Sequence, residues 1–326
     1  MDRLRPLVGQ AVAVAALACL GGSAARAASP AQIWVSARDP AWANGPGRGR
    51  IAYSRVVARR GRLTSDVYVV RADGSHLRLL RKGAASAAWS PDGRRLAFTH
   101  NGYVELARPD GTLIRRLARG SEPAWSADGR RLAYVDNRGL AVVDADGANR
   151  LQLVLTSTAV GGSFPSDPSW SPDGKTLAFV YGGYKVGIVP ADGGAVRSLG
   201  YGSSAAWSPD GIRLAVSCRH AAAVVIESPT GGDQSCDAGA QAVTGPPRWS
   251  PSGTTLVFEG CDNVSCWVTL RRGDGSFVRL ARGHQPAWSP RGDEILFGHD
   301  ISPTRQLLYR IRPDGTHLRP LLPPRK

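Results

Sequence analysis

One short sequence recurs along the whole chain, and this repetition constrains the fold more than any other feature. The string AAWSPDGRRLAF at residues 87–98 returns in five further copies, each with a Trp, a tight turn and an alternating apolar segment. A seventh, degraded copy has Tyr53 in the place of Phe98. The Trp residues of the seven copies are Trp42, Trp89, Trp125, Trp170, Trp207, Trp249 and Trp288. A period of about 40 residues is typical of repeat folds such as propellers.

A second motif alternates with the first. It consists of an apolar segment, an Asp-Gly pair and another apolar segment, as in VYVVRADGSHLRLL around Asp73. Asp-Gly between apolar runs is a strong hairpin signal, because the tight turn needs the positive φ that Gly accepts. Each unit therefore holds two hairpins, which predicts a four-stranded antiparallel blade. We predict an all-β chain folded as a β-propeller, with seven blades favoured and six or eight as alternatives.

Within a blade, the first motif has a structural task. Pro91 sets φ for the second place of a turn, Asp92 can bind nearby backbone amides, and Gly93 takes a conformation that a Cβ would obstruct. The Trp offers a large apolar surface, on the order of 150–250 Å² when buried, and we expect it to pack between neighbouring blades. The recurring Ser and Asp are therefore predicted to shape turns and not to react.

The N-terminus has the three parts of a secretory signal peptide. Arg3 and Arg5 precede an apolar run, and Ala-Arg-Ala at residues 25–27 offers a cleavage site between small side chains. We predict a signal peptide at residues 1–27 and export to the periplasm, the cell envelope or the extracellular medium. The alternative is a lipoprotein anchored through Cys19.

The repeats also set the expected division of the mature chain. Residues 28–38 are expected to form a short linker, residues 39–322 a single β-propeller domain, and residues 323–326 a C-terminal tail. The units follow one another with only short insertions, so we predict one domain and a monomer.

The chain is strongly basic. Its formal charge is +15, and removal of the predicted signal peptide, with three Arg and one Asp, leaves +13. A basic surface attracts nucleic acid or other polyanions. The Arg residues, however, stand at equivalent places of the repeat, such as Arg95, Arg131 and Arg213, and do not form a run. We expect no nucleic-acid partner, and we keep an acidic polymer as an alternative to a protein partner.

Four Cys follow the predicted signal peptide: Cys218, Cys236, Cys261 and Cys266. An even number in an exported chain predicts disulfides. Three pairings exist, and the most local joins Cys218 to Cys236 and Cys261 to Cys266. A metal site is the alternative, but no C-x-x-C spacing supports it.

The combination of W-S-P-D-G, R-x-[LI]-A-[FY] and a following Asp-Gly hairpin resembles the WD-repeat-like propeller repeat of the TolB family. The resemblance covers nearly all of the predicted mature chain and implies a propeller. Similar blades occur in peptidases of the prolyl-oligopeptidase type, in tricorn-like proteases and in oligogalacturonate lyases. TolB itself carries an additional N-terminal α/β domain, for which we expect no room here, so an identical role in the envelope is not implied.

The Ser-Pro-Asp-Gly and Asp-Gly turns of a blade share one face, and the variable loops share the other, where repeat folds usually place function. Two sets of equivalent positions lie on the variable face. Three residues before each Trp stand Asp39, Ser86, Glu122, Asp167, Ser204, Pro246 and Gln285, with His284 beside the last. The three acids could hold a cation such as calcium or attract a basic peptide. From the sequence alone we favour the simpler interpretation that these polar residues only hydrate a loop, and we keep the binding site as the functional hypothesis.

The second set ends the second strand of each unit. It comprises Arg55, His100, Asp136, Tyr181, Cys218, Gly260 and His299. Two His and one Asp are potential metal ligands, and the lyases that share this blade use His for a metal-assisted elimination. The set is incomplete, so we predict no metal centre and no catalytic residue here.

The sequence as a whole favours a binding protein over an enzyme. It contains no G-x-S-x-G elbow, no Walker loop and no H-E-x-x-H motif. We expect an envelope scaffold that binds a protein or another ligand at the mouth of the channel. The alternative is a metal-assisted polysaccharide lyase or hydrolase built on the propeller channel.

Overall fold

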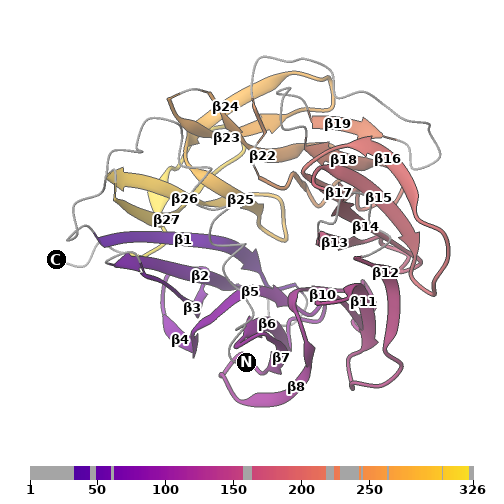
Figure 1. Ribbon diagram of the computed structural model, residues 1–326. Helices are drawn as coiled ribbons and strands as arrows, with labels where there is room; N and C mark the ends of the chain where they lie inside the picture. The colour runs from indigo at the N-terminus through magenta and orange to yellow at the C-terminus, as the bar shows by residue number, and fades with distance from the viewer. Residues whose placement is uncertain are drawn as a thin grey trace.

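The computed structural model consists of short β-strands arranged in a ring (Figure 1). It describes residues 33–44, 49–59, 62–156, 164–217, 224–227, 242–243, 245–262, 264–302 and 304–322. The predicted signal peptide, the predicted tail, Cys19, Cys218 and Cys236 lie outside these residues. Over the same ranges there is no helix with the length and hydropathy of a membrane-spanning segment.

The first and last parts of the chain share one sheet of eight strands. Its strands are β1 (Ile33–Trp42), β2 (Arg50–Arg59), β3 (Arg62–Arg71), β4 (Arg78–Lys82), β25 (His284–Trp288), β26 (Ile295–Ser302), β27 (Arg305–Ile311) and β28 (Arg319–Pro320). β1 begins within the segment expected to be a linker, six residues before Asp39.

Five further sheets complete the ring. Three have four antiparallel strands: β5 (Ala84–Trp89), β6 (Leu96–His100), β7 (Tyr103–Ala107) and β8 (Leu113–Arg119); β9 (Ser121–Trp125), β10 (Arg131–Asp136), β11 (Gly139–Asp144) and β12 (Leu151–Leu155); and β13 (Ser166–Trp170), β14 (Thr176–Tyr181), β15 (Lys185–Pro190) and β16 (Arg197–Tyr201). The last two are β17 (Ser204–Trp207), β18 (Leu214–Ser217) and β19 (Val224–Glu227); and β20 (Ala242–Val243), β21 (Arg248–Trp249), β22 (Leu256–Cys261), β23 (Cys266–Arg271) and β24 (Phe277–Arg282).

The propeller and its four-stranded antiparallel blades are confirmed, but the favoured number of seven blades is wrong. The structure has six sheets, in line with the alternative of six. The difference arises at the closure of the ring, where β1 pairs in parallel with β27 at Val35 and Arg305 and joins the first and last repeat units. The N-terminal part of β1 lies outside the repeat motif and pairs with β27 of the last unit. Counting motifs along the sequence does not reveal this pairing.

The repeat Trp residues bind one blade to the next. The indole N–H of Trp125 donates a hydrogen bond to the carbonyl of Ala88, the residue before the preceding Trp, at 3.2 Å. The same bond recurs from Trp89 to Ala41, from Trp170 to Ala124, from Trp249 to Ala206 and from Trp288 to Arg248, at 3.0–3.2 Å. A buried indole N–H needs a polar partner, and the inner strand of the adjacent blade supplies it. Among the described residues, only the indoles of Trp42, Trp207 and Trp267 are buried without one.

An Arg at a fixed place in the repeat adds contacts at three of these interfaces between neighbouring blades, which we call seams. The guanidinium of Arg95 lies 4.7 Å from the ring centroid of Trp125 and donates to the carbonyl of Gly129 at 3.0 Å. Equivalent pairs of contacts join Arg131 to Trp170 and Gly174, and Arg213 to Trp249 and Gly253. We call this set of contacts the Arg latch. The scattered Arg residues that raise the net charge therefore have a structural use in these seams.

The turn of the first motif is built around its Ser. The Ser90 hydroxyl donates to Asp92 at 2.5 Å and accepts the backbone N–H of Arg95 at 2.9 Å, while the Gly93 N–H closes the turn on the Ser90 carbonyl. In the next copy but one, the hydrogen bond from Ser171 holds the pKa of Asp173 below its ordinary value. The interpretation of these residues as turn formers is confirmed, and their side chains are occupied by the turn itself.

The Arg latch leads to a prediction about stability. Replacing Arg95 or Arg213 by Ala should lower the free energy of unfolding by about 1–3 kcal/mol, because each change removes a charge-assisted hydrogen bond and a cation–π contact. Thr176 stands at the same repeat position in a seam that has no latch, so Thr176→Ala is the matched control and should change stability by less than about 0.5 kcal/mol. Denaturant unfolding measures both, and equal losses would contradict the latch.

Candidate functional site: the channel mouth

Five inner strands share an unusual backbone conformation at the position three residues before the repeat Trp. Asp39, Ser86, Glu122, Asp167 and Gln285 have positive φ values between 50° and 54°. A side-chain-bearing residue in the left-handed region costs about 1–2 kcal/mol. The strand register shifts at each of these places, so each is a β-bulge. Bulges re-aim side chains and are frequent beside functional sites. We call this set the bulge ring.

Hydrogen bonds link members of the bulge ring across neighbouring blades. The Asp167 N–H donates to Glu122 Oε2 at 2.8 Å, and the Asp39 N–H donates to Gln285 Oε1 at 2.9 Å. The Gln285 N–H donates in turn to Glu259 Oε2 at 3.0 Å. The amides of Asp39, Asp167 and Gln285 thus bind side chains of the preceding repeat unit around the ring. These bonds compensate part of the backbone strain and hold the carboxylates in place.

The three predicted acids of the channel mouth lie close enough to perturb one another. Burial, together with the negative charges of Asp167 and Asp39, raises the pKa of Glu122 to about 7, against the opposing hydrogen bond from the Asp167 amide. Burial also raises the pKa of Asp167, with Arg248 opposing and Asp39 contributing. The Asp167 Oδ2 atom is buried without a hydrogen-bond partner among the described residues. The structure therefore brings Asp39, Glu122 and Asp167 together in a site where a second or third negative charge is unfavourable.

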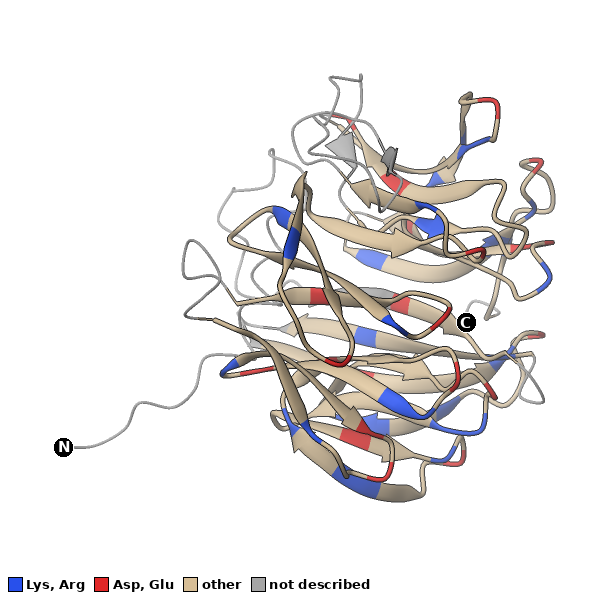
Figure 2. Ribbon diagram, turned by 90° about the vertical axis from the view of Figure 1, so that its right-hand side faces the viewer, with Lys and Arg blue, Asp and Glu red and all other residues tan. Residues whose placement is uncertain are grey.

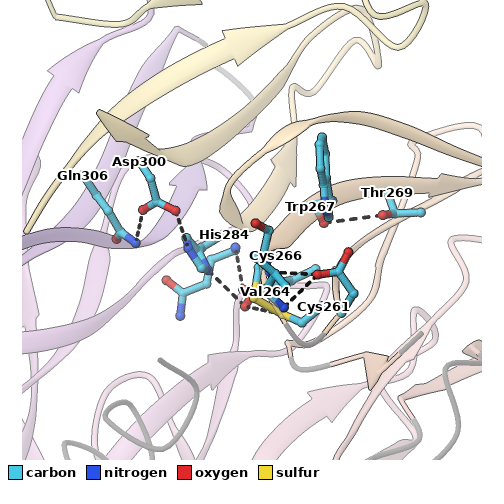
Figure 3. Close-up of a disulfide and its surroundings, with 12 residues drawn as sticks. Cys261, Val264, Cys266, Trp267, Thr269, His284, Asp300 and Gln306 are labelled. Atoms are coloured by element: carbon cyan, nitrogen blue, oxygen red, sulfur yellow. Dashed lines mark hydrogen bonds and ion pairs between the residues drawn. A yellow bond between two sulfur atoms is a disulfide. The ribbon is translucent and has the colours of Figure 1, made fainter. Parts of the chain in front are cut away.

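His284 belongs to a separate polar cluster beside Gln285. Its Nδ1 lies 3.1 Å from Glu259 Oε1, and its Nε2 lies 3.0 Å from Asp300 Oδ2 (Figure 3). Burial lowers the pKa of His284, but the hydrogen bonds to Asp300 and Glu259 outweigh it and raise the pKa to about 9. His284 is therefore an imidazolium between two carboxylates at neutral pH, and it does not face the three acids as a free base.

Sequence reasoning missed Glu259, the residue that connects the bulge ring to His284. Glu259 is 5% exposed and stands ten residues after Trp249, within an otherwise apolar strand. The equivalent residue Thr99 accepts the Glu122 N–H in the same way, at 3.2 Å. The sequence signal for this role was the single charged residue, Glu259, in an otherwise apolar strand, because a buried carboxylate needs hydrogen-bond partners.

The second predicted set is not brought together. His100 lies against the buried Glu105 at 3.2 Å, and His299 packs on the ring of Tyr309 and contacts the Arg282 carbonyl. His100 is thus engaged within its own sheet, whereas His299 contacts Tyr309 of its own sheet and the end of β24 in the adjacent sheet. No metal-ligand cluster in the described part of the chain includes either one.

Two further members of that set, Asp136 and Tyr181, are also used locally. Asp136 accepts the backbone N–H groups of Arg138 and Gly139 and pairs with Arg150 at 2.5 Å. Tyr181 packs against Phe179, with ring centroids 5.5 Å apart. Both residues therefore stabilise the ends of their strands.

The predicted disulfide between Cys261 and Cys266 is present, with an S–S distance of 2.01 Å. The two residues face each other at the end of the β22–β23 hairpin (Figure 3). The other predicted pair, Cys218 and Cys236, lies outside the described residues.

The face of the ring that carries the repeated turns has a different character. A hollow of about 480 Å³ there is lined by Arg50, Arg94, Arg95, Arg108 and Asp110, from turns of both motifs. This lining confirms that the two kinds of turn share a face. Figure 2 shows basic and acidic residues interspersed along the ribbon.

Comparison with solved structures supports the propeller fold. A chain of the mitotic checkpoint complex matches with a TM-score of 0.63 and 17% identity, over 96% of this chain and 97% of that chain. Oligogalacturonate lyase in complex with manganese matches with a TM-score of 0.61 and 14% identity, over 87% and 91%. TolB from Acinetobacter baumannii is also among the matches, with a TM-score of 0.49 and 17% identity, over 87% of this chain and 62% of that chain.

No family model and no curated protein sequence matches the chain. At such low identities, the structural likeness establishes the fold and leaves the activity open, since binding proteins and enzymes share this architecture. The chain is a β-propeller, and its structural neighbours include a chain of the mitotic checkpoint complex and oligogalacturonate lyase.

Proposed function

We propose that this protein is an exported binding scaffold of the bacterial cell envelope, which holds a cationic group of a protein or peptide partner at the channel mouth. The observation that carries the proposal is the convergence of Asp39, Glu122 and Asp167 on one site. Burial, and to a smaller extent the neighbouring carboxylates, raises the pKa values of Glu122 and Asp167, so a positive charge placed among them would be bound favourably.

The backbone of the bulge ring supports the same proposal. Left-handed conformations at side-chain-bearing residues persist where surrounding structure holds them, and they concentrate at binding and catalytic sites. Here the conformation recurs at equivalent positions, and the hydrogen bonds between blades aim the acidic side chains. The site is thus preorganised before any partner arrives, which reduces the cost of ordering on binding.

The contrast between a basic chain and an acidic channel mouth would make the site selective for cationic groups. The chain as a whole carries a formal charge of +15, so a basic partner is repelled elsewhere and attracted to the acidic mouth. A Lys or Arg side chain of a peptide supplies the required charge on a long stem that reaches into a recess. A calcium ion could satisfy the same carboxylates, and the tests below separate the two ligands.

Export is part of this proposal and rests on the N-terminal sequence. The disulfide between Cys261 and Cys266 is consistent with an oxidising compartment. The lyase alternative depended on His100 and His299 sharing a metal, whereas each of them is engaged in a different sheet. The binding role therefore has the stronger structural support.

The first test removes the acidic charges without changing side-chain shape. The triple variant Asp39→Asn, Glu122→Gln and Asp167→Asn should lose at least about tenfold in affinity for a Lys-rich peptide probe, because each lost close ion pair contributes on the order of 1 kcal/mol or more. The matched control replaces Asp110, Asp274 and Asp314 of the turn face by Asn, which removes the same number of carboxyl groups. Calorimetry with the peptide and with calcium distinguishes the ligands.

Similar losses in the triple variant and in its control would mean that net charge, and not the channel mouth, governs binding. Calcium binding without peptide binding would replace the proposed ligand class while retaining the site.

The second test uses the pKa of Glu122, which is raised to about 7. Affinity for the cationic peptide should increase as the pH rises from about 6 to 8, because Glu122 loses its proton in this interval and becomes negative. Without ligand, the folded state retains this proton more strongly than the unfolded chain, so the stability contribution of Glu122 should fall as the pH rises toward 7. Glu122→Gln should remove both dependences, and a flat wild-type profile would contradict the assignment.

A further inference from the structure

The disulfide hairpin has the geometry of a metal-binding knuckle. Cys261 and Cys266 are paired across the ends of β22 and β23, with four residues between them and their Cα atoms 4.0 Å apart. Zinc sites commonly take two of their thiolates from a tight hairpin with two to four intervening residues. The spacing C-D-N-V-S-C lies within this range.

Two further ligand types stand beside the sulfurs. Single ligand atoms of Glu259, Cys266 and His284 all lie within 4.8 Å of one another, and these residues form the one such cluster among the residues that the structure describes. Glu259 Oε1 lies 3.1 Å from His284 Nδ1 and 3.6 Å from Cys261 Sγ. Ligand atoms around tetrahedral zinc, with metal–ligand bonds of about 2.0–2.3 Å, are separated by roughly 3.3–3.8 Å. The distances from Glu259 to His284 and to Cys261 are close to those of a tetrahedral set, and Cys266 lies within 4.8 Å of both Glu259 and His284.

Neighbouring groups already orient the His and the Glu. Asp300 accepts a hydrogen bond from His284 Nε2 at 3.0 Å and is itself held by Gln306 at 2.8 Å (Figure 3). The Gln285 N–H occupies the second oxygen of Glu259 at 3.0 Å. A carboxylate behind a ligating His is the usual outer support of a zinc site, because it sets the ring orientation and raises the basicity of the ligand.

We propose that reduction of this disulfide creates a zinc site in which Cys261, Cys266, His284 and Glu259 are the four ligands. A dithiol supplies the two electrons and two protons that convert the disulfide into two thiols, and it leaves as the oxidised dithiol. Zinc then binds both sulfurs as thiolates, the imidazole through Nδ1 and one carboxylate oxygen. The two thiol protons and the imidazolium proton pass to solvent.

The proposed site is closed and structural. Four protein ligands leave no open position for a substrate, so the metal would act by joining parts of the fold. Cys261, Cys266 and Glu259 belong to the sheet of β22 and β23, whereas His284 begins β25 of the eight-stranded sheet. Zinc would therefore cross-link two adjacent sheets, while the disulfide closes only a short hairpin. This proposal is independent of the binding role of Asp39, Glu122 and Asp167.

The experiment uses cobalt(II) as a spectroscopic substitute for zinc in the full chain. The reduced protein should bind one equivalent, with a thiolate-to-cobalt charge-transfer band and the d–d spectrum of tetrahedral coordination. The oxidised protein should show neither signal. Cys261→Ser with Cys266→Ser should abolish the band, whereas Cys218→Ser with Cys236→Ser, the matched control, should retain it.

Two substitutions test the remaining ligands. His284→Ala should weaken cobalt binding at least about tenfold, and Asp300→Asn should weaken it about 10- to 100-fold through loss of the outer support. His76→Ala, in an exposed turn, is the control and should leave binding unchanged.

A measurement on the unmodified chain avoids dependence on the folding of variants. Zinc should slow the alkylation of Cys261 and Cys266 in the reduced protein, as followed by mass spectrometry of their peptides. The proposal is overturned if zinc gives these two thiols no protection, if the oxidised chain binds cobalt equally well, or if the band survives the loss of Cys261 and Cys266.

Discussion

The hydrogen bond from five of the seven repeat indoles to the neighbouring inner strand is the interaction on which the ring depends. It specifies both the distance and the register between blades, because the N–H of Trp125 reaches the Ala88 carbonyl only when the two inner strands lie side by side. The indole also buries apolar surface in the same seam, so packing and hydrogen bonding favour one arrangement. Repetition of this contact turns a series of hairpins into a closed ring.

The seams are not equivalent. Arg95, Arg131 and Arg213 reinforce three of them, whereas Thr176 occupies the same position before Trp207, whose indole N–H lacks a partner in the described structure. The chain thus combines latched seams with a weaker one. The Arg content, which first suggested a polyanion partner, is explained in part by these contacts between blades.

The contacts between neighbouring blades determine where the acidic side chains of the bulge ring lie. Because neighbouring inner strands are held in register, the Glu122 carboxylate can accept the amide of Asp167 from the next blade. The same register places acidic groups together, at the expense of raised pKa values and left-handed backbone. Left-handed backbone and raised carboxyl pKa values therefore coincide at the bulge ring.

The sequence by itself determined the repeat, the turns, the blade type and the local disulfide, because these depend on residues near one another in the chain. It also located Asp39, Glu122 and Asp167 at equivalent positions. Only the tertiary structure decided that first and last units share a sheet and that Arg95 reaches the next blade. It likewise showed that Glu259 joins His284 while His100 and His299 are engaged apart. Those contacts join residues that are far apart in the sequence and belong to different blades. The spacing of residues along the chain does not show which side chains meet across such an interface.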